Sequence, residues 1–160
     1  MSDRKPQLAV KSGSRITLNM FLLSTAIFAF FTTINLRREL LFQPVLLVQL
    51  VISIPLLLTS TLAYAKVGYR ERVERWATLG WVTFDLGYAA ILNVIGIMVG
   101  NIISTTLAVV FFSVSCGLTL IYSAVDISYS GSVASERISK DLLFIVVQVA
   151  FGLLVALKVF

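Results

Sequence analysis

The stretch that decides the fold runs from Ala77 to Val125 and reads ATLGWVTFDLGYAAILNVIGIMVGNIISTTLAVVFFSVSCGLTLIYSAV. Asp85 is the only charged residue among its 49 residues. At about 1.5 Å per residue, one helix of this length would be more than twice as long as the roughly 30 Å core of a bilayer. We therefore expect two membrane-spanning helices, over 77–99 and 103–125. They should fold back at GNIIST (100–105), because Gly and Asn tolerate the left-handed backbone of a helix end.

Three further apolar stretches are long enough to span a membrane, and they cover 16–36, 41–65 and 142–159. The first exceeds the apolar core of a secretory signal, about 7–15 residues, so we expect it to be retained. Charged residues make up 13% of the chain, whereas soluble domains average about 25%. The sequence therefore predicts an all-α integral membrane protein with a bundle of five transmembrane helices. A single transmembrane domain over 16–160 would follow a basic cytoplasmic tail, 1–15.

The basic residues are distributed unevenly between the two predicted sides of the membrane. One side holds Arg4, Lys5, Lys11, Arg15, Lys66, Arg70, Arg72, Arg75, Arg137 and Lys140, and the other holds Arg37, Arg38 and Lys158. Because cytoplasmic loops are enriched in Lys and Arg, we expect the N-terminus in the cytoplasm and the C-terminus outside, across the plasma (cytoplasmic) membrane. This pattern explains the net charge of +5 without nucleic acid. Arg70, Arg72 and Arg75 are also candidate contacts to lipid headgroups, although a solvated cytoplasmic loop would carry the same charges.

Composition excludes several kinds of catalytic site. The chain has no His and one Cys, Cys116, so the commonest general base and metal ligand are absent and no internal disulfide can form. The sequence contains no P-loop, dinucleotide-binding or G-x-S-x-G motif. An enzyme would have to rely on Asp85 and Asp126, which form no recognisable constellation. We therefore expect no enzymatic activity, no cofactor and no bound metal.

Asp85 falls on a narrow helical face of small and polar residues. At 100° per residue this face spans an arc of about 80°, and it holds Thr78, Asp85, Ala89, Asn93, Gly96 and Gly100. Gly96 and Gly100 form a G-x-x-x-G motif, which lets another helix approach closely. Asp85 lies roughly 13 Å along the helix from Trp76, near the bilayer midplane. Polar residues predicted at equal depth on the other spans are Ser24, Thr25, Thr59, Ser60, Cys116, Thr119 and Gln148.

An ionised carboxylate at this depth costs at least about 2.5 kcal/mol. Two alternatives follow: a permanently protonated packing group, or a site that exchanges a proton or cation. The candidate ion pathway consists of Asp85, Asn93, Thr59, Ser60, Thr119 and Gln148. Pro55 is expected to kink its helix, either for packing or as a gating element.

Two classes of function remain. The first is a non-catalytic subunit or scaffold of a membrane complex, which acts through helix–helix packing. The alternative is a homo-oligomeric proton or cation channel or transporter that uses Asp85. The expected partners are the lipid bilayer and either other membrane subunits or further copies of the chain. The absence of an internal repeat gives no support to an inverted-repeat transporter.

Overall fold

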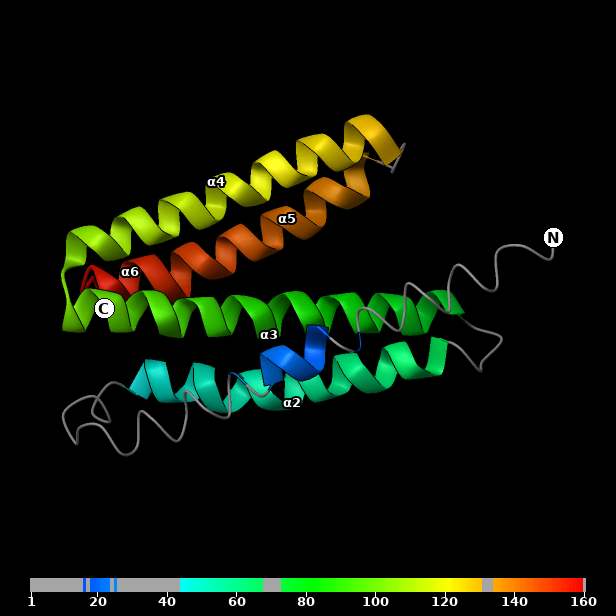
Figure 1. Ribbon diagram of the computed structural model, residues 1–160, viewed down its shortest axis with the longest axis horizontal. Coiled ribbons are helices and arrows are strands. Elements are labelled where there is room, and N and C mark those ends of the chain that lie inside the picture. The colour runs from blue at the N-terminus through cyan, green and yellow to red at the C-terminus, as the bar shows by residue number, and fades with distance from the viewer. Residues whose placement is uncertain are drawn as a thin grey trace. The chain divides into compact units, whose positions relative to one another are not determined.

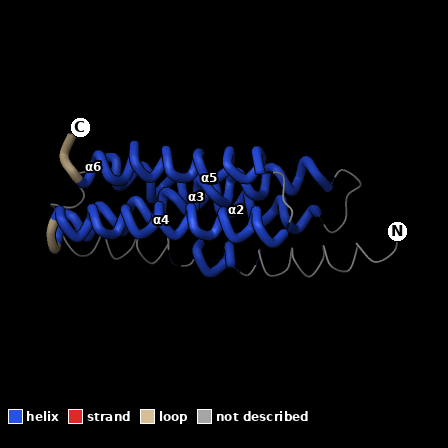
Figure 2. Tube along the Cα trace, turned by 90° about the horizontal axis from the view of Figure 1, so that it is seen from above, coloured by secondary structure: helices blue, strands red, loops and turns tan. Residues whose placement is uncertain are grey.

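The computed structural model describes residues 16, 18–23, 25, 44–67, 73–130 and 134–159. Within these ranges the chain is helical except at Ile103–Ser104 and beyond Ala156, and it forms no strand (Figure 1 and Figure 2). The elements are α2 (Pro44–Val67), α3 (Val73–Ile102), α4 (Thr105–Ser130), α5 (Ala134–Gln148), the π-helical turn η2 (Val149–Leu153) and α6 (Leu154–Ala156). The all-helical prediction is therefore confirmed for the described residues.

Four helical segments are long and apolar enough to cross a membrane, so the chain is a membrane-embedded multi-pass protein. These segments are Pro44–Val67, Glu74–Ile102, Thr105–Ser128 and Ile138–Ala156. Each overlaps one of the predicted spans 41–65, 77–99, 103–125 and 142–159. The predicted first span, 16–36, lies mostly outside the described residues, as does the tail 1–15. The fifth span and the orientation of the termini stay predictions.

The turn between α3 and α4 falls within the predicted segment 100–105. Helix α3 continues through Gly100 and Asn101 and ends at Ile102. The side-chain oxygen of Ser104 accepts a hydrogen bond of 3.2 Å from the backbone N–H of Leu107. This is the geometry of an N-cap, in which a serine hydroxyl binds an otherwise unpaired N–H of the first turn. The cap explains why α4 begins at Thr105.

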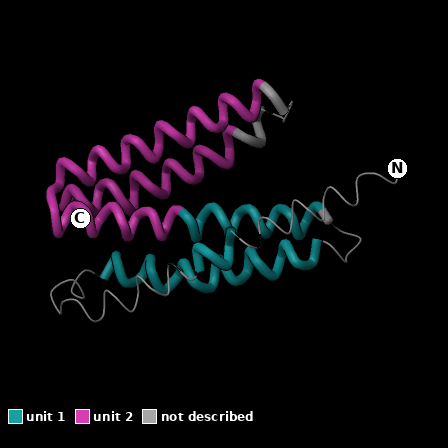
Figure 3. Tube along the Cα trace, viewed as in Figure 1, with its two compact units in different colours: residues 1–88 teal, residues 89–160 magenta. Residues whose placement is uncertain are grey.

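The chain divides into two compact units, residues 1–88 (unit 1) and 89–160 (unit 2) (Figure 3). Helix α3 contributes its first part to unit 1 and its second part to unit 2. The prediction of one transmembrane domain over 16–160 is not tested by this division and stays a prediction.

In unit 1, one face of α2 is buried, and its residues recur at regular helical spacing. Its buried members include Leu46, Leu50, Ser53, Leu57, Ser60 and Tyr64, spaced alternately by four and three residues as helix packing requires. Large side chains from this buried face of α2 pack directly against two glycines of α3. A Cβ on Gly80 would lie 3.1 Å from the Tyr64 ring, and one on Gly87 would lie 3.0 Å from Leu57 Cγ. Pro55 lies on the exposed side of α2, which remains helical on both sides of it.

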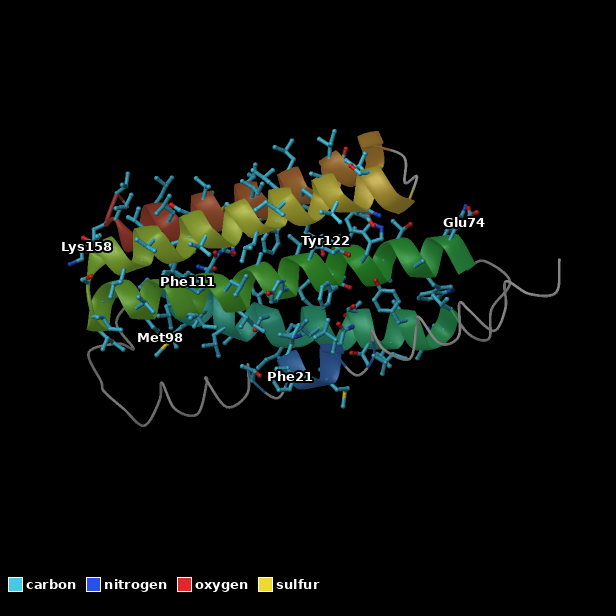
Figure 4. The ribbon with its side chains drawn as sticks, turned by 45° about the horizontal axis from the view of Figure 1, so that its top comes forward. Phe21, Glu74, Met98, Phe111, Tyr122 and Lys158 are labelled. Carbon is cyan, nitrogen blue, oxygen red and sulfur yellow. The ribbon has the colours of Figure 1, made fainter. Side chains whose placement is uncertain are left out.

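In unit 2, α4 packs against α5, η2 and α6. Phe112 is almost completely buried in the core, together with Ala108, Phe144 and Ala156. Many large apolar side chains elsewhere on α4 and α5 are exposed, among them Leu118, Tyr122 and Leu142. Figure 4 draws the side chains of these helices and labels Tyr122. In a membrane-embedded chain such side chains are suited to contact with lipid.

Candidate functional site: two buried polar centres

The first polar centre lies in unit 1 and consists of Asn19, Ser60 and Gly80. Asn19 Nδ2 donates a hydrogen bond of 2.7 Å to Ser60 Oγ. Ser60 Oγ in turn donates one of 2.7 Å to the carbonyl oxygen of Gly80. The Asn19 and Ser60 side chains are fully buried. The centre thus links three separate segments of the chain by polar contacts that water cannot reach.

The same unit holds three other residues of the predicted ion pathway or of its surroundings. Asp85 on α3 and Thr59 on α2 are half-buried. Thr25, in the short helical piece before α2, donates a hydrogen bond of 3.0 Å to the carbonyl oxygen of Phe21 in its own helical turn. A role of Asp85 and Thr59 in ion passage stays a prediction. Ser60, by contrast, has its hydroxyl engaged in the first polar centre.

The second polar centre lies in unit 2 and consists of Asn93, Cys116 and Gln148. Asn93 and Gln148 are fully buried. Asn93 Nδ2 donates a hydrogen bond of 3.3 Å to the carbonyl oxygen of Val147. Cys116 Sγ lies 3.6 Å from Gln148 Oε1 and donates to it. Three residues that the sequence singles out by helical face or by depth are thereby brought around one turn of α5.

Thr119 does not join this centre through its hydroxyl. Thr119 Oγ1 donates a hydrogen bond of 3.0 Å to the carbonyl oxygen of Ser115, one turn earlier in α4. A threonine bonded in this way satisfies its hydroxyl within its own helix. Of the predicted ion-pathway residues in unit 2, Asn93 and Gln148 are therefore the pair whose polar atoms reach across helices.

The G-x-x-x-G motif of α3 receives helices of its own chain. A Cβ on Gly96 would lie 2.6 Å from Phe112 Cε2 and 3.0 Å from Phe111 Cδ1. A Cβ on Gly100 would lie 3.1 Å from that of Ala108 and 3.6 Å from that of Ala156. The close approach expected at this motif is thus made inside unit 2, by α4 and α6.

Unit 2 also holds a buried carboxyl group that the sequence did not single out. Asp141 on α5 is buried and accepts a hydrogen bond from the hydroxyl of Ser123 on α4, which is also buried. The predicted span begins at Leu142, which leaves Asp141 in the preceding loop. Asp141 precedes Gln148 by seven residues, so the two lie on one face of the helix. This spacing is the signal by which the sequence could have identified Asp141.

The predicted headgroup contacts are only partly described. Arg70 and Arg72 lie outside the described residues, and Arg75 is exposed near the start of α3. At the same end of unit 1, Lys66 Nζ lies 4.3 Å from the centroid of the Trp76 ring. A lysine over an indole ring is a cation–π contact, and both side chains are common at membrane interfaces. The pair joins the end of α2 to the beginning of α3.

Within the part of the chain that the structure describes, no three His, Cys, Asp or Glu side chains are grouped so as to hold a metal ion. Comparisons with protein-family models, with curated proteins and with solved structures give no match to this chain. Its function is therefore inferred from the geometry of the two units.

Proposed function

We propose that this protein is a non-catalytic subunit or scaffold of a membrane complex, and that it binds another membrane helix through one side of α4. We name this side the α4 stripe. It consists of Thr106, Ser113, Gly117, Ala124 and Ser128. At 100° per residue these positions fall within an arc of about 60°, and one bulky exposed residue, Val110, lies at the edge of that arc. Apart from the half-exposed Gly117, all are exposed.

Gly117 is the observation that carries the proposal. A Cβ on Gly117 would meet nothing within 4 Å, so no packing within the described part of the chain requires a glycine there. Glycine in a helix interior costs about 0.8–1 kcal/mol relative to alanine. Small residues along a membrane helix allow close approach of a second backbone. A partner helix against the α4 stripe would account for the glycine.

The neighbouring surface of α4 differs from the stripe. It carries Leu107, Val114, Leu118 and Val125, all exposed and all bulky. Side chains of this kind suit contact with lipid. The contrast between bulky and small residues on one exposed helix favours lipid on the first surface and protein on the second.

Gly117→Leu is expected to release the partner from the complex, because its side chain would fill the space that a second backbone needs. The measurement is size-exclusion chromatography with light scattering in mild detergent, together with pull-down of the tagged full chain. The matched control is Val114→Leu, which adds bulk to the lipid-facing surface of the same helix and should leave the complex intact. A wild-type chain that purifies as a stable monomer with no co-purifying membrane protein would contradict the proposal.

The second candidate function is the proton or cation pathway. It is favoured by the half-buried carboxyl of Asp85 inside a membrane-spanning segment, Glu74–Ile102, since such groups are rare and commonly functional. Asp85→Asn is then expected to abolish proton or cation flux into proteoliposomes while assembly is unchanged. Asp126→Asn, near the end of its span, is the control. Wild-type vesicles without flux above protein-free vesicles would rule this candidate out.

A further inference from the structure

The second polar centre leaves two buried atoms without a hydrogen-bond partner among the described residues. They are the side-chain oxygen of Asn93, Oδ1, and the side-chain nitrogen of Gln148, Nε2. Both side chains are fully buried. A buried amide atom left unpaired is costly, and within a membrane no bulk water is present to satisfy it.

Asn93 Oδ1 and Gln148 Nε2 both belong to side chains that lie near the junction of α5 and η2 in unit 2. Asn93 Nδ2 binds the carbonyl oxygen of Val147, the residue immediately before Gln148. Asn93 Oδ1 lies against Gly152, one turn after Gln148, at the place where a Cβ on Gly152 would stand. The side chain of Asn93 therefore lies along the turn that begins at Gln148, where α5 passes into the wider π-helical turn η2. Such turns occur frequently at functional sites.

The two atoms are also chemically complementary. Asn93 Oδ1 is an acceptor and Gln148 Nε2 is a donor. Cys116 donates to Gln148 Oε1, which holds the glutamine amide with its nitrogen available on the other side. A cation would be attracted to Asn93 Oδ1 but repelled by the N–H groups of Gln148. A ligand that both accepts and donates a hydrogen bond fits both.

We propose that Asn93 and Gln148 bind a buried water molecule, which accepts a hydrogen bond from Gln148 Nε2 and donates one to Asn93 Oδ1. Buried waters in proteins characteristically bind polar groups that are otherwise unsatisfied, with about three hydrogen bonds each. The water joins α3 to the junction of α5 and η2, in addition to the direct bond from Asn93 to Val147.

The test is nuclear magnetic resonance on the ¹⁵N-labelled full chain in lipid nanodiscs. Cross-relaxation between water protons and the side-chain NH₂ group of Gln148 is measured, and Gln148→Met assigns the signal by removing it. We expect a cross-peak of bound water in the wild type and its loss in Asn93→Leu. Gln49→Met, which alters a buried amide of unit 1, is the control and should leave the cross-peak unchanged.

Two measurements on the wild type keep the proposal testable even if Asn93→Leu fails to fold. Absence of the water cross-peak from an assigned Gln148 NH₂ group overturns it. So does a scalar coupling across a hydrogen bond from Gln148 Nε2 to Asn93, because that coupling requires a direct bond between the two amides. A water cross-peak that persists in folded Asn93→Leu likewise overturns it.

Discussion

Gly96→Leu is expected to lower the unfolding temperature of unit 2 strongly. The first side-chain carbon alone would collide with the ring of Phe112, and Phe111 Cδ1 stands 3.0 Å away. Phe112 is 1% exposed, so its ring has no free space into which to turn. Overpacking of a filled core costs about 1–3 kcal/mol and sometimes more, and a leucine adds three further carbon atoms to the collision.

The single cysteine supplies the measurement for this prediction. Cys116 is half-buried in unit 2, so a thiol-reactive fluorogenic dye reports the opening of that unit as temperature rises, and circular dichroism gives an independent melting curve. The matched control is Gly117→Ala, whose added carbon meets nothing within 4 Å and should leave the midpoint equal or raise it. If the unfolding temperature of Gly96→Leu equals that of the wild type, the described packing of α4 on α3 is incorrect.

Ser60→Ala is expected to destabilise unit 1 by about 1–3 kcal/mol, the usual cost of leaving a buried polar group unsatisfied. The substitution removes the hydroxyl that accepts from Asn19 and donates to Gly80, and it adds no atom at this fully buried position. The fully buried amide of Asn19 would then lose its partner. Bonds between membrane helices average about 0.6 kcal/mol, so an effect above about 1 kcal/mol would mark the loss of both.

Tryptophan fluorescence reports this change, because both tryptophans, Trp76 and Trp81, belong to unit 1. The matched control is Thr61→Val on the same helix. Thr61 Oγ1 donates only to the carbonyl oxygen of Leu57, 2.9 Å away in its own helix, so its loss leaves no other side chain unpaired. Equal unfolding midpoints for Ser60→Ala and Thr61→Val would show that the first polar centre contributes nothing to stability.

The helical class and four spans could be predicted from the sequence because they depend on the distribution of charge along the chain. A membrane-spanning helix must keep charged groups out of about 30 Å of hydrocarbon. Each span can therefore be recognised in the sequence as a long run of uncharged residues. The end of α3 was less predictable. Gly100 and Asn101 permit a helix end but do not require one, whereas Ser104 supplies an N-cap to the next helix.

The polar centres were predictable only in part, for a geometric reason. Counting residues from the membrane surface gives the depth of a side chain, and depth alone points to Ser60, Cys116 and Gln148. It does not give the rotation of each helix about its axis, which decides the neighbours. Depth therefore does not identify Asn19 and the carbonyl of Gly80 as partners of Ser60, and Thr119, at a suitable depth, binds its own helix instead.

The division of α3 between two units has a consequence for the order of events during synthesis. Asn19, Ser60 and Gly80 all precede residue 89, so the first polar centre can form while the rest of the chain is still being made. Gly152 follows Asn93 by 59 residues, which at about 5–20 residues per second takes roughly 3–12 s. During that interval the side chain of Asn93 has not yet met Val147 and Gly152, because these residues have not been synthesised. We therefore expect nascent chains that end before Val147 to be those that a membrane insertase or chaperone retains.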